Sequence, residues 1–448
     1  MAPGLDEGRS VVWARLRERG LQALAVGLAT SMLYAEGVLK NGWIEVALLS
    51  PILWFLLASR VPLLLHNCLL SLLTICLTVP GMDLLLRPVM ERRLNYTPLN
   101  VYAHKLPRLP IVGRWDSNLV LDEDLYGDLS AISGDPALRE SRRIIFKTDE
   151  AGFRNSFVPP KIEVLILGDS FAAGWGTTQE EIFSQLLSAR YGQSTYNLAY
   201  PGGPYDQYVN FAIEWPRLTF ASNKRMVWAL YAGNDLDDAA GDTWDLDQLP
   251  WQSGLGEWVV QYRTFRNRSP LNRLMENMRR RWMQSERHTN EVVIRRLPSG
   301  QPILFRPKEE NWSRRSQAEI EQLENFRKLE RTLKAMRDLA AVRGIEVTLV
   351  VLPTKGDIYR WILDQRPARP EDEETSGFAR AVLASCQRIK MQCIDTKPYL
   401  IEKARQLYTL TGALLWWRDD THMNGNGHEA IATLVRRQIL DEEAPQRP

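Results

Sequence analysis

A serine that follows an apolar run is the first residue in this sequence whose position suggests chemistry. Residues 164–167 are Val-Leu-Ile-Leu, and such an apolar, partly β-branched run predicts a strand that is buried on both faces. Gly168 ends the run, and Ser170 follows two residues later. Because ligands bind outside the carboxyl ends of the strands in an open parallel sheet, Ser170 stands where a nucleophile would be placed.

A serine needs a base to take its proton, so the histidines are the next residues to consider. Of the five histidines, only His422 follows an acid by three residues, in the run Asp419-Asp420-Thr421-His422. Across a tight turn, residues three apart can face each other, so Asp419 is predicted to hold one imidazole nitrogen while the other faces Ser170. The remaining histidines lie in apolar, arginine-rich or helical contexts, or lack a nearby acid: His66, His104, His288 and His428.

Four short blocks together resemble the SGNH (GDSL-type) hydrolase superfamily, and they occur in its order. The blocks are Gly168-Asp169-Ser170-Phe171, the glycine of Pro201-Gly202-Gly203, Gly233-Asn234-Asp235 and Asp419-x-x-His422. The resemblance spans residues 161–235 and 343–440. Residues 148–155 also resemble a segment that precedes the first block in membrane-linked members. One departure is Ala232, where the third block usually has a glycine.

The resemblance implies a role for each matched residue. Ser170 would be the nucleophile, His422 the general base, and Asp419 the acid that orients His422. The oxyanion hole would consist of the backbone N–H groups of Ser170 and Gly202 and the side chain of Asn234. Each residue alone could instead be a helix N-cap or a turn former, so the prediction depends on their joint occurrence in order.

Alternating strand and helix patterns predict an α/β fold with a parallel sheet and helices on both faces. The resemblance implies that residues 161–448 form a three-layer α/β/α SGNH hydrolase-like catalytic domain. Residues 87–160 are rich in Pro, Asp, Arg and Tyr, and we expect an extended lead-in over that domain. Strands are expected at residues 162–167, 195–198, 226–231 and 346–352, and helices near 179–191, 205–215, 317–342 and 425–439.

An insertion at residues 237–315 interrupts this alternation. It contains a predicted hairpin near residues 292–306, scattered tryptophans that include Trp312, and a stretch, residues 262–315, with 14 Lys and Arg against 5 Asp and Glu. We predict that the insertion lies over the active-site edge and binds an anionic polymer or lipid headgroup through Arg279, Arg280 and Arg281, because guanidinium groups match carboxylates and phosphates. A solvated arginine-rich helix is the alternative.

Three apolar stretches, residues 21–39, 43–59 and 61–86, follow a polar N-terminus of residues 1–20. The first and third are long enough to cross a hydrocarbon core of roughly 30 Å, and the second is marginal. Three such stretches argue against a cleaved signal peptide and predict about three transmembrane helices over residues 21–86; a buried helical hairpin is the alternative. The arginine-rich N-terminus favours an integral protein of a bacterial inner membrane, with its catalytic domain facing the periplasm or cell exterior.

The composition narrows the classes of function. A net charge of +2 over 448 residues produces no overall positive potential that would attract nucleic acid. No cysteine spacing resembles a zinc site, so neither a metal nor another cofactor is expected. Cys386 and Cys393 could form a disulfide in an oxidising compartment or remain two buried thiols.

These observations favour a membrane-anchored serine esterase that removes an O-acyl group, in the leading hypothesis acetyl, from a cell-surface glycan. An O-acyltransferase would use the same residues, because transfer and hydrolysis share an acyl-enzyme and differ in whether a sugar or water attacks it. The SGNH-like proteins of exopolysaccharide O-acetylation are similar in pairing a serine site with membrane segments or with a membrane-bound acyltransferase partner. A non-catalytic glycan-assembly protein with a relict site is a third hypothesis, which a complete triad disfavours.

Overall fold

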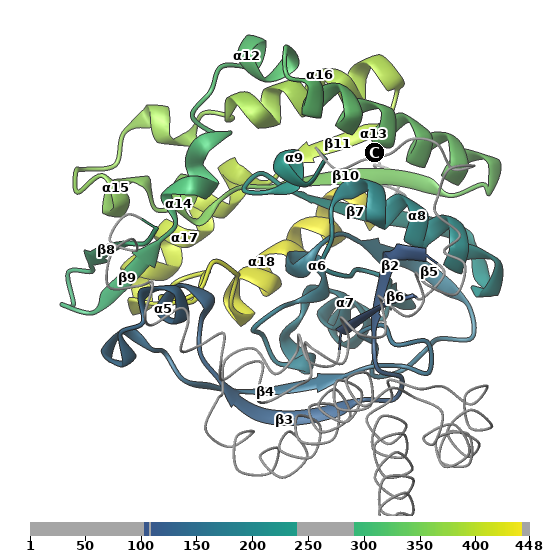
Figure 1. The fold of residues 1–448 in the computed structure, drawn as a ribbon, viewed down its shortest axis with the longest axis horizontal. Helices are drawn as coiled ribbons and strands as arrows, with labels where there is room; N and C mark the ends of the chain where they lie inside the picture. Colours follow the sequence, from purple (N-terminus) through teal and green to yellow (C-terminus); the bar gives the residue numbers. More distant parts are fainter. Residues whose placement is uncertain (1–102, 107–108, 240–290, 441–448) are drawn as a thin grey trace, which may run out of the picture. The chain divides into compact units, whose positions relative to one another are not determined.

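The computed structural model describes residues 103–106, 109–239 and 291–440, and their centre is a five-stranded parallel sheet (Figure 1). The strand order is β11-β10-β7-β5-β6, and each neighbouring pair is parallel. The predicted α/β fold with a parallel sheet is therefore confirmed. The strands are β5 (Ile162–Leu167), β6 (Thr195–Asn197), β7 (Phe220–Tyr231), β10 (Glu346–Leu352) and β11 (Gln392–Asp395).

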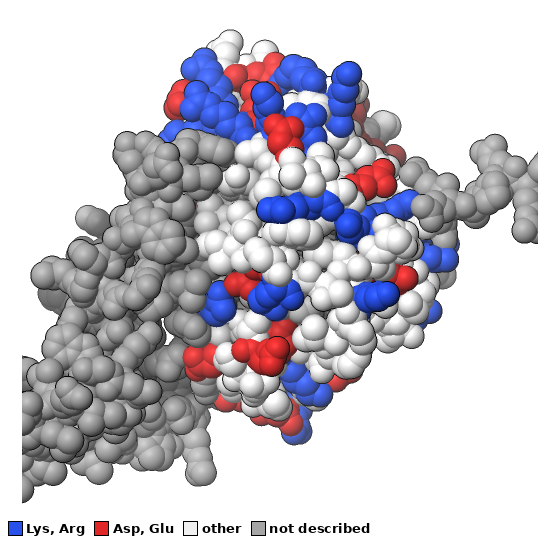
Figure 2. All heavy atoms as spheres, turned by 90° about the vertical axis from the view of Figure 1, so that its right-hand side faces the viewer, with Lys and Arg blue, Asp and Glu red and all other residues white. Residues whose placement is uncertain are grey.

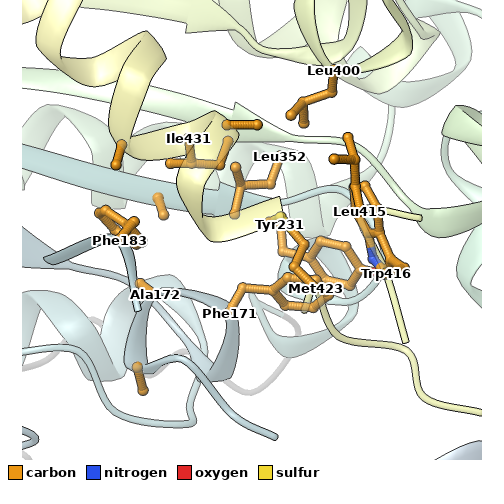
Figure 3. Close-up of a cluster of buried hydrophobic side chains, with 14 of the residues drawn as sticks. Phe171, Ala172, Phe183, Tyr231, Leu352, Leu400, Leu415, Trp416, Met423 and Ile431 are labelled. Atoms are coloured by element: carbon orange, nitrogen blue, oxygen red, sulfur yellow. The ribbon is translucent and has the colours of Figure 1, made fainter. Parts of the chain in front are cut away.

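Helices cover both faces of the sheet because successive side chains of each strand point to opposite sides. In β5, Val164 and Ile166 belong to one apolar cluster, and Leu165 and Leu167 belong to the other. The first cluster is shown in part in Figure 3, where Phe171, Tyr231 and Met423 lie close to one another. Its helices are α7 (Phe183–Tyr191), α17 (Lys397–Thr411) and α18 (Gly425–Val435); the second cluster has α8 (Pro204–Glu214), α13 (Glu324–Val342) and α16 (Gly377–Ile389).

The lead-in contains more regular structure than the sequence predicted. Its described residues form two antiparallel strand pairs, one α-helix and one 3-10 helix, and the strands β3 and β4 run side by side in Figure 1. The sequence pattern did not predict these elements, because each strand is short and lies outside the main sheet. The elements are β1 (Ala103–Leu106), β2 (Leu109–Trp115), β3 (Val120–Leu125), α5 (Asp128–Ser133), η3 (Pro136–Leu138) and β4 (Arg142–Lys147).

The described end of the insertion contains the predicted hairpin, β8 (Val293–Arg296) with β9 (Pro302–Phe305). A capping box formed by Ser316 and Glu319 begins one of the helices that follow, α12 (Gln317–Glu321), as their spacing predicts. The other helices are α6 (Ser170–Ala173), η4 (Gln179–Glu181), η5 (Trp215–Arg217), α9 (Asp235–Asp238), η9 (Pro307–Asn311), α14 (Lys355–Ile358), α15 (Arg360–Leu363), η10 (Pro370–Glu373) and the π-turn η11 (Arg436–Leu440).

The predicted transmembrane helices lie outside the described residues. Within the residues that the structure describes, no helix is both long and apolar enough to cross a bilayer.

One face of the described surface carries charges of both signs at its top, at the height of α13 and α16, and is mostly uncharged at its centre (Figure 2). Ion pairs such as Arg388–Glu330 and Arg327–Glu324 belong to these two helices, so this part of the surface presents no field of a single sign.

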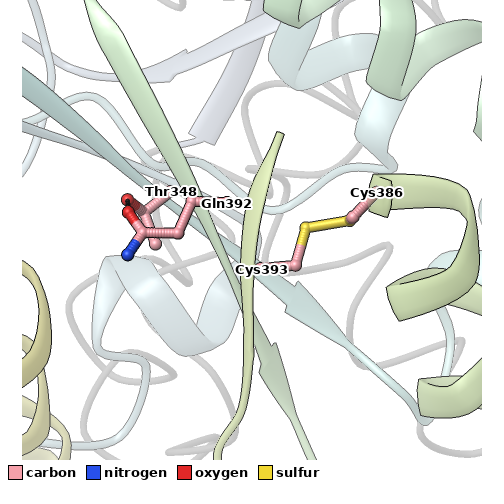
Figure 4. The surroundings of a disulfide bond; sticks show 4 residues. All are labelled: Thr348, Cys386, Gln392 and Cys393. Carbon is pink, nitrogen blue, oxygen red and sulfur yellow. Dashed lines mark hydrogen bonds between the residues drawn. A yellow bond between two sulfur atoms is a disulfide. The ribbon is translucent and has the colours of Figure 1, made fainter. Parts of the chain in front are cut away.

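A disulfide joins Cys386 at the end of α16 to Cys393 in β11, with the two Cα atoms 6.2 Å apart (Figure 4). Of the two alternatives that the sequence left open, the structure therefore has the bonded pair. Beside it, Thr348 of β10 donates a hydrogen bond of 2.6 Å to the Gln392 side chain. The closed loop is short, so the entropic stabilisation is about 2–3 kcal/mol.

Because His428 is buried, we expect the stability of the fold to fall at acidic pH. Its side chain accepts a hydrogen bond of 3.4 Å from the Phe183 N–H, and burial together with the charges of Arg154 and His422 lowers the pKa of His428 to about 3. Below the unfolded pKa of about 6.5, the unfolded chain gains a proton that the folded chain excludes, so stability falls as pH falls towards 3. The loss between pH 7.5 and pH 5 is about 2 kcal/mol.

In the variant His428→Gln, which keeps an acceptor, this part of the pH dependence is expected to disappear. Urea unfolding at pH 7.5 and at pH 5 measures it for both proteins. Equal losses of stability on acidification in the wild type and the variant would contradict the assignment.

Candidate active site

Ser170 begins α6 immediately beyond the carboxyl end of β5. The turn between them is tight, because Gly168 has a φ of +147° and a Cβ there would lie 2.5 Å from the Ala172 Cβ. Asp169 caps the helix, its carboxylate accepting a hydrogen bond of 2.9 Å from the Phe171 N–H. The strand, the glycine and the cap together fix the direction in which the Ser170 side chain leaves the sheet.

His422 lies next to Ser170, as the sequence predicted. The His422 Nε2 and the Ser170 Oγ are 2.9 Å apart, a distance suited to proton transfer. The imidazole ring is tilted beside Phe171, with ring centroids 4.8 Å apart, and its side chain is 12% exposed. A partly open histidine beside a serine hydroxyl can serve as the base of an acyl-transfer reaction.

Asp420 orients His422, and the prediction that Asp419 does so is wrong in its geometry. The Asp420 Oδ1 lies 2.8 Å from the His422 Nδ1 and also accepts the His422 backbone N–H at 3.1 Å. The segment 417–422 lies between Trp416 and Met423, which form an antiparallel bridge, so the turn is wider than the tight turn that was assumed. In this wider loop the residue two positions before His422, rather than three, faces the imidazole.

Asp419 points instead into the lead-in. Its Oδ2 accepts hydrogen bonds from the Gly127 N–H at 2.7 Å, the Glu140 N–H at 2.9 Å and the Ser130 hydroxyl at 3.0 Å. Its backbone carbonyl accepts the N–H groups of Leu129 and Ser130 in the first turn of α5. Asp419 is fully buried, and its contacts join the lead-in to the loop that carries His422.

The electrostatics of the pair favour a charged Asp420 and a basic His422. Burial disfavours the charged imidazole, but the hydrogen bond with Asp420 and the charges of Asp420 and Asp128 raise the pKa of His422 above its ordinary value. Burial likewise opposes ionisation of Asp420, yet the hydrogen bond with His422 and the charge of Arg142 hold the pKa of Asp420 well below its ordinary range. His422 can therefore accept a proton beside a carboxylate that stays ionised.

The predicted oxyanion donors follow neighbouring strands at the same edge of the sheet: Ser170 after β5, Gly202 after β6 and Asn234 after β7. Among the described residues, no acceptor pairs with the backbone N–H of Ser170 or Gly202. The Asn234 Nδ2 donates one hydrogen bond of 2.9 Å to Asp238, which leaves its second N–H for another acceptor. These groups can donate to a developing oxyanion, but their assignment stays a prediction.

Residues far away in the sequence hold the loop of residues 417–422, and sequence reasoning missed all of them. The buried Lys355 donates hydrogen bonds to the carbonyls of Trp417, Arg418 and Asp420 at 2.7, 3.0 and 3.1 Å. Asp128 accepts the Thr421 N–H at 2.8 Å and the Thr421 hydroxyl at 2.7 Å. Position in the sequence offered no signal for these contacts, because each partner is more than sixty residues from the loop.

One cluster of potential metal ligands lies here, among the described residues. Ligand atoms of Asp128, Asp420 and His422 are within 4.8 Å of one another. Asp420 and His422 are hydrogen-bonded to each other, and Asp128 is bonded to Thr421 while burial and the Asp420 charge raise its pKa to about 7. The hydrogen bonds account for this arrangement without a metal ion.

The motif at residues 148–155 supports the turn that carries Ser170. The buried Arg154 donates hydrogen bonds to the carbonyl of Ala173, the last residue of α6, at 3.0 Å and to the carbonyl of Thr177, shortly after this helix, at 2.6 Å. Asn155 exchanges hydrogen bonds with the backbone of Asn197 at the end of β6. The motif therefore acts through the backbone on two of the strand ends that form the candidate site.

Of the insertion, the structure describes residues 237–239 and 291–315, so Arg279, Arg280 and Arg281 lie outside the described residues and their role stays a prediction. The Leu304 N–H in β9 donates a hydrogen bond of 2.8 Å to the Arg418 carbonyl, so this end of the insertion contacts the loop of residues 417–422. Trp312 is 8% exposed and belongs to the second apolar cluster. It is therefore a core residue and is not available to stack on a sugar.

Comparison with known protein families gives a match for the C-terminal part of this chain. Residues 304–448 match the family described as SGNH hydrolase-like domain, acetyltransferase AlgX. The chain is thus an SGNH-like protein, and it is an enzyme of the class that acts on esters as a hydrolase or acyltransferase. No curated protein sequence matches the chain.

Three solved structures are similar at low sequence identity. A G-D-S-L family lipolytic protein from Veillonella parvula is 10% identical, covers 62% of this chain and 98% of its own, and has a TM-score of 0.31. A carbohydrate esterase with divergent catalytic and non-catalytic binding functions is 11% identical over 68% of this chain and 72% of its own, with a TM-score of 0.28. A family 2 carbohydrate esterase from Corynascus thermopiles is 12% identical over 66% of this chain and 75% of its own, with a TM-score of 0.27.

Proposed function

We propose that this protein modifies the acetylation of a glycan through an acetyl-enzyme formed on Ser170. The observation that carries the proposal is the continuous path from the Ser170 hydroxyl through His422 to Asp420, with contacts of 2.9 and 2.8 Å. His422 takes the proton of Ser170 as it attacks the acetyl carbonyl, and returns it to the leaving group of the acetyl donor, which is the sugar oxygen in the case of an esterase. Asp420 holds the imidazole in the tautomer that leaves Nε2 free to accept.

The two forms of this function differ in the second step. In a membrane-anchored esterase, water attacks the acetyl-enzyme and acetate leaves; in an O-acyltransferase, a sugar hydroxyl attacks and an acetylated glycan leaves. The match of residues 304–448 to a family described as an acetyltransferase supports the second form. Both forms use the same serine, histidine and oxyanion donors, so they share one test of the acetyl-enzyme.

The test follows the acetyl group of 4-nitrophenyl acetate in the full-length protein purified in detergent. Release of nitrophenol with acetylation of the peptide that contains Ser170, seen by mass spectrometry, is the expected first result. Adding a neutral or an anionic oligosaccharide then separates the two forms: acetylated oligosaccharide indicates transfer, and acetate alone indicates hydrolysis. Absence of both nitrophenol release and acetylated Ser170 would overturn the proposal.

We propose further that the protein is anchored in a membrane with its catalytic domain in an oxidising compartment. The apolar stretches within residues 21–86 support the anchor, and the disulfide between Cys386 and Cys393 supports a periplasmic or extracellular location, because cytosolic disulfides are rare. A membrane-bound acyltransferase is then a suitable partner, since it would supply acetyl groups across the bilayer to Ser170.

The anchor predicts how the full-length chain partitions. After cell lysis and washing of the membranes with alkaline carbonate, the protein is expected to stay in the pellet and to be extracted only by detergent. A variant that lacks residues 1–86 serves as the comparison and is expected in the soluble fraction, because the described sheet begins at residue 162. Recovery of the full-length chain in the supernatant without detergent would contradict the anchor.

A further inference from the structure

Arg142, the first residue of β4, is a buried arginine whose donors converge on the loop of residues 417–422. Its side chain is 5% exposed. The Nη1 group donates a hydrogen bond of 2.9 Å to the Asp419 Oδ1, and the Nη2 group donates to the Asp420 Oδ2. The Nε group donates to the Gly176 carbonyl at 3.1 Å, and the guanidinium lies over the Trp417 ring at 4.4 Å. One planar group thus contacts both neighbouring aspartates.

The two oxygens of Asp420 have different partners, and this division sets the direction of the carboxylate. Oδ2 contacts Arg142, and Oδ1 faces His422. Rotation about the last bond of an aspartate side chain is intrinsically broad, so a second contact is needed to fix it. Arg142 supplies that contact and at the same time holds the Asp419 carboxylate away from His422.

We propose that Arg142 is a positioning residue that makes Asp420, rather than Asp419, the acid that orients His422. The inference rests on the proposed function for its catalytic consequence, but not for its effect on His422. A fork of donors in one plane can hold two carboxylates in a fixed relation, which a single ammonium group cannot do. Arg142 belongs to the lead-in, so the lead-in takes part in aligning the site.

The first test is Arg142→Lys, which keeps the positive charge and removes the planar fork. The kcat for 4-nitrophenyl acetate is expected to fall by about 10²-fold, the usual effect of a misplaced group, with little change in KM. The matched control is Arg143→Lys at the adjacent residue, whose guanidinium donates two hydrogen bonds to the exposed Asp122 side chain. This control is expected to keep the wild-type kcat.

The second test measures the pKa of His422 by NMR of histidine-labelled protein, a readout that needs no activity. The acidic groups near His422 are Asp420, Asp128, Asp169 and Glu309, and Arg142→Lys alters none of them chemically. If the Asp420 carboxylate loses its alignment, its hydrogen bond to His422 weakens and the pKa of His422 falls. A shift of His422 to lower pH in Arg142→Lys, but not in Arg143→Lys, supports the inference even if the wild type shows no turnover.

The third test is chemical rescue of Arg142→Ala by guanidinium at non-denaturing, millimolar concentration. Guanidinium is expected to restore kcat in Arg142→Ala and to have no such effect in Asp420→Asn, which lacks the carboxylate to be positioned. If Arg142→Ala does not fold, Arg142→Lys alone decides. Wild-type kcat together with an unchanged pKa of His422 in Arg142→Lys would overturn the inference, whereas absence of turnover in the wild type would overturn only the proposed function.

Discussion

Replacing Ser170 by alanine is expected to abolish labelling by a fluorophosphonate and to lower the turnover of 4-nitrophenyl acetate by about 10³-fold or more. The reason is that the hydroxyl 2.9 Å from the His422 Nε2 is the group that would form the acyl bond. Labelling is measured by intact-protein mass spectrometry, and turnover by nitrophenol release. His422→Ala is expected to lose a similar factor, and the double variant little more, because the two groups act as a unit.

The control for this prediction is Ser156→Ala, at an exposed serine in the loop before β5. It should be labelled and should turn over substrate as the wild type does. Labelling that persists in Ser170→Ala, or a fully active wild type that the reagent fails to label, would contradict the role of Ser170.

The sequence predicted the position of Ser170 because short-range rules decide it. An apolar run ending in Gly168 predicts β5 over residues 162–167, and the structure has the strand at these bounds. The serine after such a strand necessarily lies at the carboxyl edge of a parallel sheet. The same rules place Gly202 and Asn234 at that edge, since both follow strands whose carboxyl ends were predicted to within one residue, although β7 begins at Phe220, six residues before its predicted start.

The choice between Asp419 and Asp420 could not be predicted in this way. Spacing alone favoured the acid three residues before His422, on the assumption of a tight turn. In the structure the loop is held open from outside, by Lys355 at its carbonyl groups and by Arg142 at its carboxylates. The contacts of Asp419 and Asp420 with the lead-in join residues about 280 apart, and local spacing carries no information about them.

Asp420→Asn is the second change with a large expected effect, a fall in kcat of about 10⁴-fold. An amide in this position can present an N–H to the imidazole, which favours the tautomer in which Nε2 carries the proton and cannot accept one from Ser170. The change also removes the charge and the hydrogen bond that raise the pKa of His422. Since the reaction needs neutral His422, the acidic limb of the profile of kcat/KM against pH is expected to move to lower pH.

The matched variant is Asp419→Asn at the neighbouring residue. It should lose stability, by about 1–3 kcal/mol, because the Asp419 carboxylate accepts three hydrogen bonds at Oδ2 and one from Arg142 at Oδ1, and an amide has only one oxygen and cannot accept at both positions. Its kcat should fall far less than that of Asp420→Asn, and its acidic limb should stay near that of the wild type. If Asp419→Asn instead lost turnover and shifted its acidic limb while Asp420→Asn stayed active, Asp419 would be the acid that orients His422, and the arrangement of hydrogen bonds described here would not be the catalytic one.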